Sequence, residues 1–213
     1  MREHNHIPVA IIGYSGHAYV AIDILQSTGI AVAGYCELQK KDFDPFSIPY
    51  LGCDEEDDTI RKLRDLRYFV AIGENQVRRS VMERLMNKLP PPVNAIHRAA
   101  IVADSAIIGS GVMIAAAAVI NPLAVIGLGV VCNTSCSIDH ECRIADFAHI
   151  APGAVLSGNV TVGENTFVGA GAVVKQGVRI GKNVVVGAGS VIIRDIPDGQ
   201  TIIGNPGYEL KNI

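Results

Sequence analysis

The sequence contains no tryptophan, and aromatic residues make up only 5% of its 213 positions. A conventional globular core usually relies on large aromatic side chains, whereas a narrow solenoid is filled by rows of slim β-branched residues. An excess of positive charge is missing too: the formal net charge is −3, without the basic footprint that nucleic acid requires. The chain is therefore expected to build a solenoid and to have no nucleic-acid partner.

Long apolar runs and paired cysteines are missing as well. No run of about 18 apolar residues occurs, and the opening MREHNHIPVA does not have the pattern of a signal peptide. The five cysteines are an odd number, and none are spaced as CxxC. We therefore expect reduced thiols in a cytoplasmic protein that neither inserts into a membrane nor binds a metal.

The strongest positive feature is a repeat of six residues that runs without interruption from Ile101 to Ile196. It comprises sixteen hexads, and fifteen of their second places hold Val, Ile or Leu. This period is typical of a β-helix, with three hexads in each coil. We predict about five coils in a column roughly 25 Å tall, with the second-place side chains along its axis. Glycine often follows at the third place, where we expect a tight corner that excludes a Cβ.

Apolar runs and helical periodicity alternate in residues 7–95. Strands are predicted at IPVAIIG, IAVAGYC and RYFVAIG, with a fourth, short strand at PPPVNAIH. Helices are predicted up to about Thr28 and from about Asn75 to Leu89. This alternation is typical of βαβ units, so a Rossmann-like half-domain is expected at residues 1–97. The β-helix then occupies residues 98–213, with a tail, IPDGQTIIGNPGYELKNI, that leaves the repeat.

One hexad, SIDHEC, contains a histidine and a glutamate at places where neighbouring hexads have small or turn residues. Residues 18 apart stack on adjacent coils, so His140 should lie beneath Gly158, whose N–H could serve as an oxyanion donor. A neutral imidazole can take the proton of an attacking amine or hydroxyl, and Asp139 or Glu141 could orient the ring. An exposed polar corner without catalytic function explains these residues equally well.

His149 follows His140 by nine residues, which is half a coil, so the two histidines should lie on different faces of one turn. They can meet at one site only if a second subunit brings in its own face. This arrangement points to an active site at a subunit interface. A metal site formed by these histidines with Cys136 and Cys142 is a weaker alternative, because the spacing matches no zinc pattern.

A second cluster, GYSGH at residues 13–17, follows the first expected strand and opens the first expected helix. Backbone N–H groups at such a position can bind phosphate oxygens, which favours a nucleotide-binding role for Gly13, Ser15 and Gly16. The cluster is not GxGxxG, because Ser15 and Ala18 take the second and third glycine positions. The sequence therefore gives little support to a dinucleotide.

Two side chains near this loop have a less certain purpose. Glu37 ends the second expected strand, where its carboxylate could accept a hydrogen bond from a ribose or a base. His17 lies in the first turn of the expected helix. An ordinary strand-to-helix turn with exposed polar residues explains both equally well, and their role stays open.

These motifs together resemble the bacterial sialic-acid O-acetyltransferase family, which includes nucleotide-sugar N-acetyltransferases acting on bacillosamine and perosamine precursors. The similarity lies in GYSGHA, in SIDHECRIADFAHIAPGAVLSGNVTVG and in IIGNPGYEL, so it covers almost the whole chain. The tail differs from the family's GNPA ending by Gly207, and Glu37 stands where the family often has Asp.

The resemblance implies left-handed coils and a homotrimer, with acetyl-CoA in the groove between neighbouring solenoids. It implies that His140 is the general base and that Glu141 is its acidic partner. It also implies that His149 and the backbone at Gly158 meet the acetyl end of the cofactor.

The resemblance extends to the remaining contacts of both substrates. The backbone around Ala170 and Ala188 would contact the pantetheine arm of acetyl-CoA. The loop from Gly13 to His17, together with Glu37, would hold the nucleotide of the sugar.

The function expected from these residues is acetyl-CoA-dependent N-acetylation of a nucleotide-linked 4-amino-4,6-dideoxy sugar. The sugar amine would attack the thioester directly, without an acyl-enzyme. One alternative is O-acetylation of a sialic-acid-type sugar, and another is a non-catalytic hexapeptide-repeat scaffold. The nucleotide, the sugar and the choice between an amine and a hydroxyl are not determined by the sequence.

Overall fold

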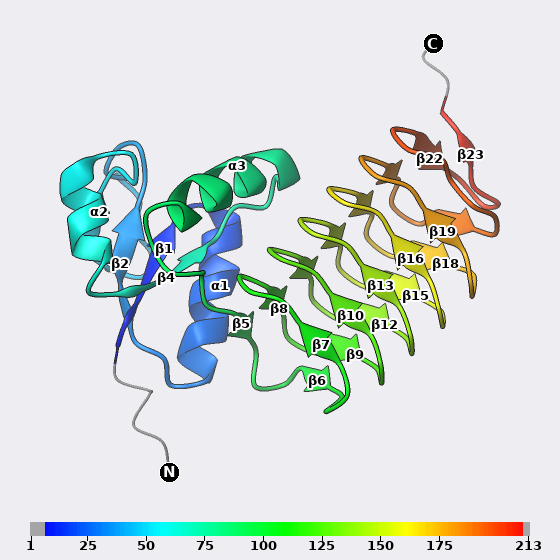
Figure 1. The fold of residues 1–213 in the computed structure, drawn as a ribbon, viewed down its shortest axis with the longest axis horizontal. Helices are drawn as coiled ribbons and strands as arrows, with labels where there is room; N and C mark the ends of the chain where they lie inside the picture. The colour runs from blue at the N-terminus through cyan, green and yellow to red at the C-terminus, as the bar shows by residue number, and fades with distance from the viewer. Residues whose placement is uncertain (1–6, 211–213) are drawn as a thin grey trace.

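A computed structural model of the chain describes residues 7–210. Residues 1–6, which belong to the segment MREHNHIPVA considered above, and residues 211–213 of the tail lie outside the described residues. An α/β part is followed along the chain by a long column of parallel strands, and the column continues away from the α/β part (Figure 1). None of the described helices is long and apolar enough to cross a membrane.

The N-terminal part contains a parallel sheet of four strands in the order β3-β2-β1-β4. Three of them confirm the predicted strands, and their bounds are β1 (Val9–Ile12), β2 (Val32–Cys36) and β4 (Arg67–Val70). The fourth, β3 (Tyr50–Gly52), lies in the proline-containing stretch where no strand was predicted. It forms a strand because it pairs with β2. The three residues of β3 carry no local sequence pattern that predicts this pairing.

Helices cover both faces of this sheet. The predicted helices are confirmed as α1 (Gly16–Ser27) and α3 (Asn75–Met86), whereas the short α2 (Asp57–Leu63) was not predicted. One apolar cluster joins α1 to one face of the sheet, and another joins α2 and α3 to the opposite face. The result is a Rossmann-like layer arrangement, as predicted.

The hexad repeat forms a left-handed parallel β-helix. Each of the sixteen hexads begins with a two-residue strand, and the second-place side chains fill the core of the column. These strands are β6 (Ile101–Val102), β7 (Ile107–Ile108), β8 (Met113–Ile114), β9 (Val119–Ile120), β10 (Val125–Ile126), β11 (Val131–Cys132), β12 (Ser137–Ile138), β13 (Arg143–Ile144), β14 (His149–Ile150), β15 (Val155–Leu156), β16 (Thr161–Val162), β17 (Phe167–Val168), β18 (Val173–Val174), β19 (Arg179–Ile180), β20 (Val185–Val186) and β21 (Val191–Ile192).

The column has three faces, which correspond to its three sheets. The domain face, with β8, β11, β14, β17 and β20, packs on the N-terminal part. The apolar face carries β6, β9, β12, β15, β18 and β21, and the charged face carries β7, β10, β13, β16 and β19. Because strands 18 residues apart pair in register, as His149 pairs with Val131 and Phe167, each row of side chains runs straight up the column.

The third-place glycines do exclude a Cβ, but for a different reason from the predicted tight corner. A Cβ on Gly163 would lie 2.4 Å from the carbonyl carbon of Gly181 on the next coil. These glycines therefore allow adjacent coils to stack closely. The left-handed backbone of each corner falls two residues later, at the fifth place, where Gly171 (φ 65°), Glu141 (φ 59°) and Asn165 (φ 62°) adopt it.

Both ends of the column differ from the prediction. The strand in PPPVNAIH is β5 (Ala95–Ile96), and it pairs with β8 of the solenoid rather than with the N-terminal sheet. The tail leaves the hexad register but stays in the column. Its strand β22 (Thr201–Ile203) pairs in parallel with β20, and β23 (Tyr208–Glu209) folds back antiparallel on β22.

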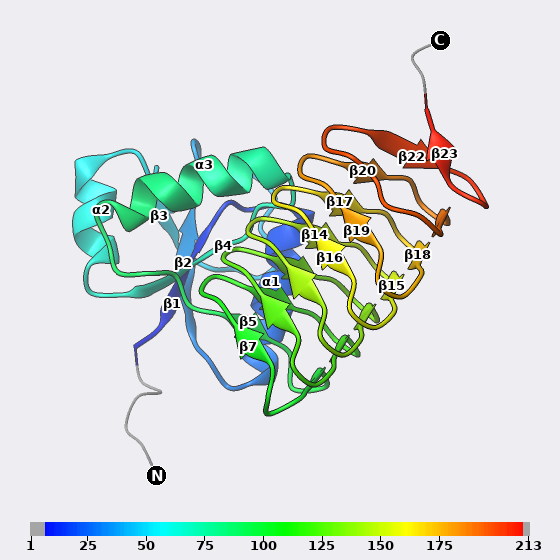
Figure 2. The same ribbon diagram turned by 45° about the vertical axis from the view of Figure 1, so that its right-hand side comes forward.

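Most of the N-terminal part covers the first coils of the domain face, and the start of α3 reaches the edge of later coils, where Gln76 contacts Asn183 (Figure 2). The outward row of this face starts with Met113 and Val131, which are 0% and 1% exposed beneath α1. His149 comes next at 7%, and Val185 at the far end of the row is 43% exposed. His149 therefore lies at the margin between the two parts of the chain.

Candidate functional site

His140 lies at the corner between the apolar face and the charged face, and its side chain is 48% exposed. Its Nδ1 is 3.1 Å from Oε2 of Glu141. Asp139 does not contact the ring: its Oδ1 accepts from the backbone N–H of His140 at 2.7 Å and from Nδ2 of Asn121 at 3.2 Å. Glu141 therefore orients the imidazole, while Asp139 stabilises the turn.

Gly158 lies against the His140 ring on the next coil, as the stacking rule predicted. A Cβ at this position would be 2.4 Å from Cε1 and 2.5 Å from Nε2 of His140. The backbone carbonyl of His140 accepts from Asn159 N–H at 2.8 Å, which joins the two coils at this corner. A side chain at this position would therefore displace the imidazole from its place over the glycine.

Ala170 and Ala188 lie at a different corner, between the domain face and the apolar face. Both are exposed, and the N–H of Gly189 donates to the Ala170 carbonyl at 2.8 Å, so the two alanines lie on consecutive coils. Within one chain, the whole width of the apolar face separates these alanines from His140.

His149 lies on the domain face, with its ring against the N-terminal part. Its Nδ1 is 3.4 Å from the Gly73 carbonyl, and its Nε2 is 3.2 Å from Nδ2 of Asn133. The ring centroids of Phe167 and His17 lie 5.0 and 6.1 Å away. The structure thus brings His149 together with His17, and it keeps both apart from His140 of the same chain.

The environment of these two histidines favours the neutral imidazole. Burial lowers the pKa of His149 to about 4, and the positive charge of Arg78 contributes to the decrease. Burial also lowers the pKa of His17 to about 4, again with a contribution from Arg78. Both rings are therefore uncharged near neutral pH.

The loop after β1 leads into the N-terminus of α1, where backbone N–H groups have no partner within the helix. Gly13 has a φ of 88°, and its N–H donates to the Cys36 carbonyl at 2.9 Å. Ser15 is the N-cap residue of the 12-residue helix α1, but its hydroxyl does not cap the helix. Ser15 and Gly16 are both exposed, so the hydroxyl and the first backbone N–H groups of α1 are accessible to a ligand.

Glu37 contacts this loop directly. Its carboxylate accepts from the N–H of Tyr14 and from the N–H of Leu38, each at 3.1 Å, and it pairs with Lys41 at 3.4 Å. Glu37 therefore has a structural role in holding the loop, which the sequence left open.

Sequence reasoning missed Gly73, Asn133 and Arg78. Gly73 follows the carboxyl end of β4, beside β1, where the strand order reverses and open α/β sheets bind ligands, so that rule could have identified it. Asn133 precedes His149 by 16 residues, not 18, and Arg78 belongs to a helix with several charged residues, so neither position carries a sequence signal.

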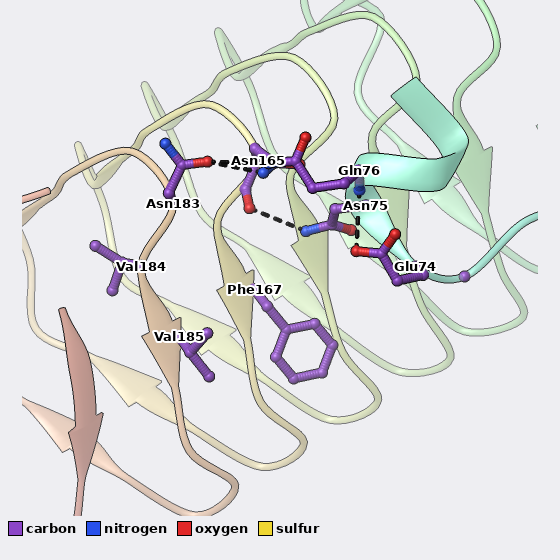
Figure 3. A pocket seen from close by; sticks show the side chains of 9 residues that line it. Glu74, Asn75, Gln76, Asn165, Phe167, Asn183, Val184 and Val185 are labelled. Atoms are coloured by element: carbon purple, nitrogen blue, oxygen red, sulfur yellow. Dashed lines mark hydrogen bonds between the residues drawn. The ribbon is translucent and has the colours of Figure 1, made fainter. Parts of the chain in front are cut away.

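A cavity of about 450 Å³ lies where α3 begins, next to Gly73. Figure 3 shows the first residues of α3 facing side chains of the solenoid across this space, and its lining includes Glu74, Asn75, Gln76, Asn165, Phe167, Asn183 and Val185. Both parts of the chain therefore form its wall.

The alternative metal site does not assemble. Cys136 and Cys142 are buried in the core of the column, whereas His140 is exposed at a corner and His149 faces the N-terminal part. Over residues 7–210, no three His, Cys, Asp or Glu side chains gather in a way that could hold a metal ion.

Comparison with known proteins places these features in a family. Residues 8–85 match the family described as PglD N-terminal domain, and residues 159–194 match the bacterial transferase hexapeptide (six repeats). The chain is 35% identical over 105 residues to GDP-perosamine N-acetyltransferase of Escherichia coli O157:H7, and 36% identical over 110 residues to UDP-N-acetylbacillosamine N-acetyltransferase of Bacillus subtilis strain 168. These matches span 49% and 51% of this chain, and 48% and 51% of the relatives, which is about half their length.

Solved structures match over nearly their full length. A histidine-to-asparagine mutant of perosamine N-acetyltransferase from Caulobacter crescentus, in complex with CoA and GDP-perosamine, has 37% identity and a TM-score of 0.91, covering 96% of this chain and 97% of that one. The acetyltransferase domain of PglB from Neisseria gonorrhoeae FA1090, in complex with acetyl coenzyme A, has 35% identity and a TM-score of 0.88, covering 95% and 98%. The chain therefore belongs to the family of hexapeptide-repeat acyltransferases that contains the perosamine and bacillosamine N-acetyltransferases.

Proposed function

We propose that this protein transfers an acetyl group from acetyl-CoA to the amine of a nucleotide-linked 4-amino-4,6-dideoxy sugar. The observation that carries the proposal is the His140–Glu141 pair, exposed at a corner of the solenoid and packed on a glycine. The same chain supplies a helix N-terminus suited to a nucleotide phosphate. Similar proteins are named GDP-perosamine N-acetyltransferase and UDP-N-acetylbacillosamine N-acetyltransferase.

In the proposed reaction, Nε2 of His140 takes a proton from the sugar amine as the amine attacks the thioester carbonyl. The carboxylate of Glu141 holds Nδ1 and stabilises the imidazolium that results. The N–H of Gly158 donates to no acceptor in the described part of the chain, which leaves it available to the developing oxyanion. Collapse of the tetrahedral intermediate releases the CoA thiol, with the proton returned by His140.

Acetyl-CoA fits the solenoid through residues that keep the backbone accessible. The exposed Ala170 and Ala188, one coil apart, present small side chains along one corner, where a long pantetheine arm can lie against the backbone. In our proposal the acetyl end of acetyl-CoA contacts His149 and Gly158. The nucleotide of the sugar contacts Gly13, Ser15, Gly16, His17 and Glu37. On this basis residues 1–97 bind the nucleotide sugar and residues 98–213 bind acetyl-CoA.

The assembly that we propose is a homotrimer with three interfacial sites. The apolar face supports this proposal, because its outward residues Ile101, Val155 and Val173 are 65%, 39% and 40% exposed in the single chain. His140 borders this face on one side and the alanine corner borders it on the other. Packing of neighbouring solenoids would bring these two corners, from different chains, to one site.

Mixing inactive variants tests this assembly. His140→Ala and His149→Ala chains, unfolded and refolded together, should recover part of the activity, because some interfaces then contain both histidines. Each variant refolded alone is the control. A mixture with no more activity than the separate variants, or an active monomer in light scattering, would refute the interfacial site.

The function itself is tested by incubation with acetyl-CoA and 4-amino sugars linked to UDP, GDP, dTDP or CMP. At least one should be N-acetylated, and the same ligand should raise the melting temperature, because it binds only the folded state. Acetylation of a hydroxyl sugar with no reaction at any amine would overturn the proposal. We place the reaction in the cytoplasm, a location that the five free, buried cysteines support.

A further inference from the structure

Arg78 is buried between the two parts of the chain, with a side chain that is fully enclosed at 1% exposure. Its guanidinium has five N–H donors, and five acceptors surround it. Nε donates to the Gly129 carbonyl at 2.8 Å, Nη1 to the carbonyls of Ile72 and Gly73 at 3.1 and 3.0 Å, and Nη2 to the Phe147 carbonyl at 2.8 Å and to Oδ1 of Asn75 at 2.9 Å.

All five acceptors are neutral oxygens, so this cation is buried without a carboxylate among its hydrogen-bond partners. Burial lowers the pKa of Arg78 to about 10, and the group stays charged near neutral pH. Loss of this side chain would leave five buried oxygens without their donor, so the guanidinium fixes the segments that carry these oxygens relative to one another.

The acceptors connect the nucleotide side to the solenoid. Ile72 lies against the phosphate-binding loop, since a Cβ on Gly13 would be 2.9 Å from Cγ1 of Ile72. Gly129 and Phe147 belong to consecutive corners of the solenoid. Arg78 thus fixes the loop after β4 between the nucleotide-binding loop and the β-helix.

The Gly73 carbonyl is shared between Arg78 and His149. A carbonyl only accepts, so its contact with His149 requires the ring proton on Nδ1. Oδ1 of Asn133 accepts from the N–H of Thr134 at 2.8 Å, which turns Nδ2 of Asn133 towards Nε2 of His149 as a donor. Both contacts select the same neutral tautomer.

We propose that Arg78 is a positioning residue of the active site. Through the Gly73 carbonyl it holds His149 as the Nδ1–H tautomer and places that N–H at the junction of the two parts. It also holds the nucleotide-binding loop at a set distance from the solenoid. This inference rests on the proposed function only where it concerns turnover, because the tautomer of His149 is a property of the free protein.

The direct test is the ¹⁵N NMR signature of His149 at pH 7, assigned with the His149→Gln variant. We expect a protonated Nδ1 and an unprotonated Nε2 in the unmodified protein. In Arg78→Met the loop that carries the Gly73 carbonyl loses its anchor, so this carbonyl should move away from Nδ1 and the Nε2–H tautomer should gain population against the remaining Asn133 contact. Arg78→Lys keeps the charge but has three donors for five acceptors. It should therefore show a smaller shift towards the Nε2–H tautomer of His149. If Arg78→Met does not fold, the test rests on Arg78→Lys.

The neighbouring Arg79 provides a matched control on the same helix. It joins α3 to the solenoid through Glu164 at 3.2 Å but is not bonded to Gly73. Arg79→Gln should leave the His149 signature unchanged. A wild-type His149 protonated on Nε2, an unchanged signature in both Arg78 variants, or an equal change in Arg79→Gln would each overturn the proposal.

Kinetics separate positioning from simple stabilisation. Arg78→Lys should lower kcat roughly 10- to 100-fold and raise the KM for the nucleotide sugar, because it disturbs both His149 and the nucleotide-binding loop. A merely structural role would lower the active fraction and leave this KM as it is, which would also contradict the proposal. If no amino sugar is turned over at all, the proposed function fails, while the NMR test of Arg78 still stands.

Discussion

The two histidines of the solenoid, nine residues apart in one repeat, occupy opposite kinds of environment. His140 stands on an exposed corner, where a glutamate holds Nδ1 and Nε2 lies over a glycine. His149 lies beneath the N-terminal part, with both ring nitrogens close to partners. The first ring is half exposed to solvent, whereas burial and the charge of Arg78 lower the pKa of the second and keep it neutral near pH 7.

This difference comes from the covering of the column and not from the repeat itself. Both residues lie on a regular coil, but only the domain face meets α1 and the loop after β4. The same residue type therefore acquires different chemistry on two faces of one solenoid. Four predictions sharpen the comparison.

Replacement of His140 by alanine should have the largest effect. If Nε2 of His140 is the base, His140→Ala lowers kcat by roughly 10²- to 10⁴-fold. The melting temperature should remain close to that of the unmodified protein, because the side chain is half exposed. Steady-state kinetics and circular dichroism measure both, and turnover within a few-fold of the unmodified enzyme would remove His140 from the mechanism.

A methyl group on the neighbouring coil should disturb the same ring. In Gly158→Ala the new Cβ would lie 2.4 Å from Cε1 of His140, so the imidazole must move. We expect kcat to fall roughly 10- to 100-fold, since small misplacements of a reacting group are costly. In a His140→Ala background the same change should have almost no effect on kcat, and a full additional loss there would show that Gly158 acts independently of the ring.

Acidification should lower the free energy of unfolding through the two buried histidines, His17 and His149. The pKa values of His17 and His149 are about 4 in the folded chain, against 6.5 for an ordinary histidine. Between these values the unfolded chain binds protons that the folded chain does not, so stability falls as the pH drops from 7 towards 4. Each histidine should account for about 2 kcal/mol at pH 5.

Urea unfolding at pH 7 and at pH 5 measures this loss. His17→Gln should remove about half of the difference that the pair contributes, whereas His140→Ala serves as a control that leaves the loss in place. An equal loss in His17→Gln and in the unmodified protein would mean that this histidine is not buried as described.

The smallest effect is expected at the nucleotide loop. A bulky residue at Gly13 would collide with Ile72 of the chain itself, so it cannot report on the ligand. Ser15→Ala is cleaner, because the Ser15 hydroxyl does not cap α1. We expect the KM for the nucleotide sugar to rise roughly 3- to 10-fold, with the KM for acetyl-CoA unchanged. The opposite pattern would reverse the proposed division of labour between the two parts.

The features that could be predicted are those that depend on the spacing of residues along the chain. The six-residue period places every strand of the column, because each coil repeats the same inward position. The stacking of Gly158 on His140 follows from the same count. By contrast, β3 and α2 escaped prediction, since β3 exists through its pairing with β2.

The sequence by itself determined the solenoid, the Rossmann-like half-domain and the candidate base, because periodicity and motif spacing are local properties. Only the tertiary structure decided that Glu141, and not Asp139, contacts the ring of His140, that Glu37 holds the loop after β1, and that Arg78 is buried. Each of these depends on which face of one element meets another. A charged residue in a helix has no local signal that distinguishes a solvated side chain from one enclosed by five carbonyl-type oxygens.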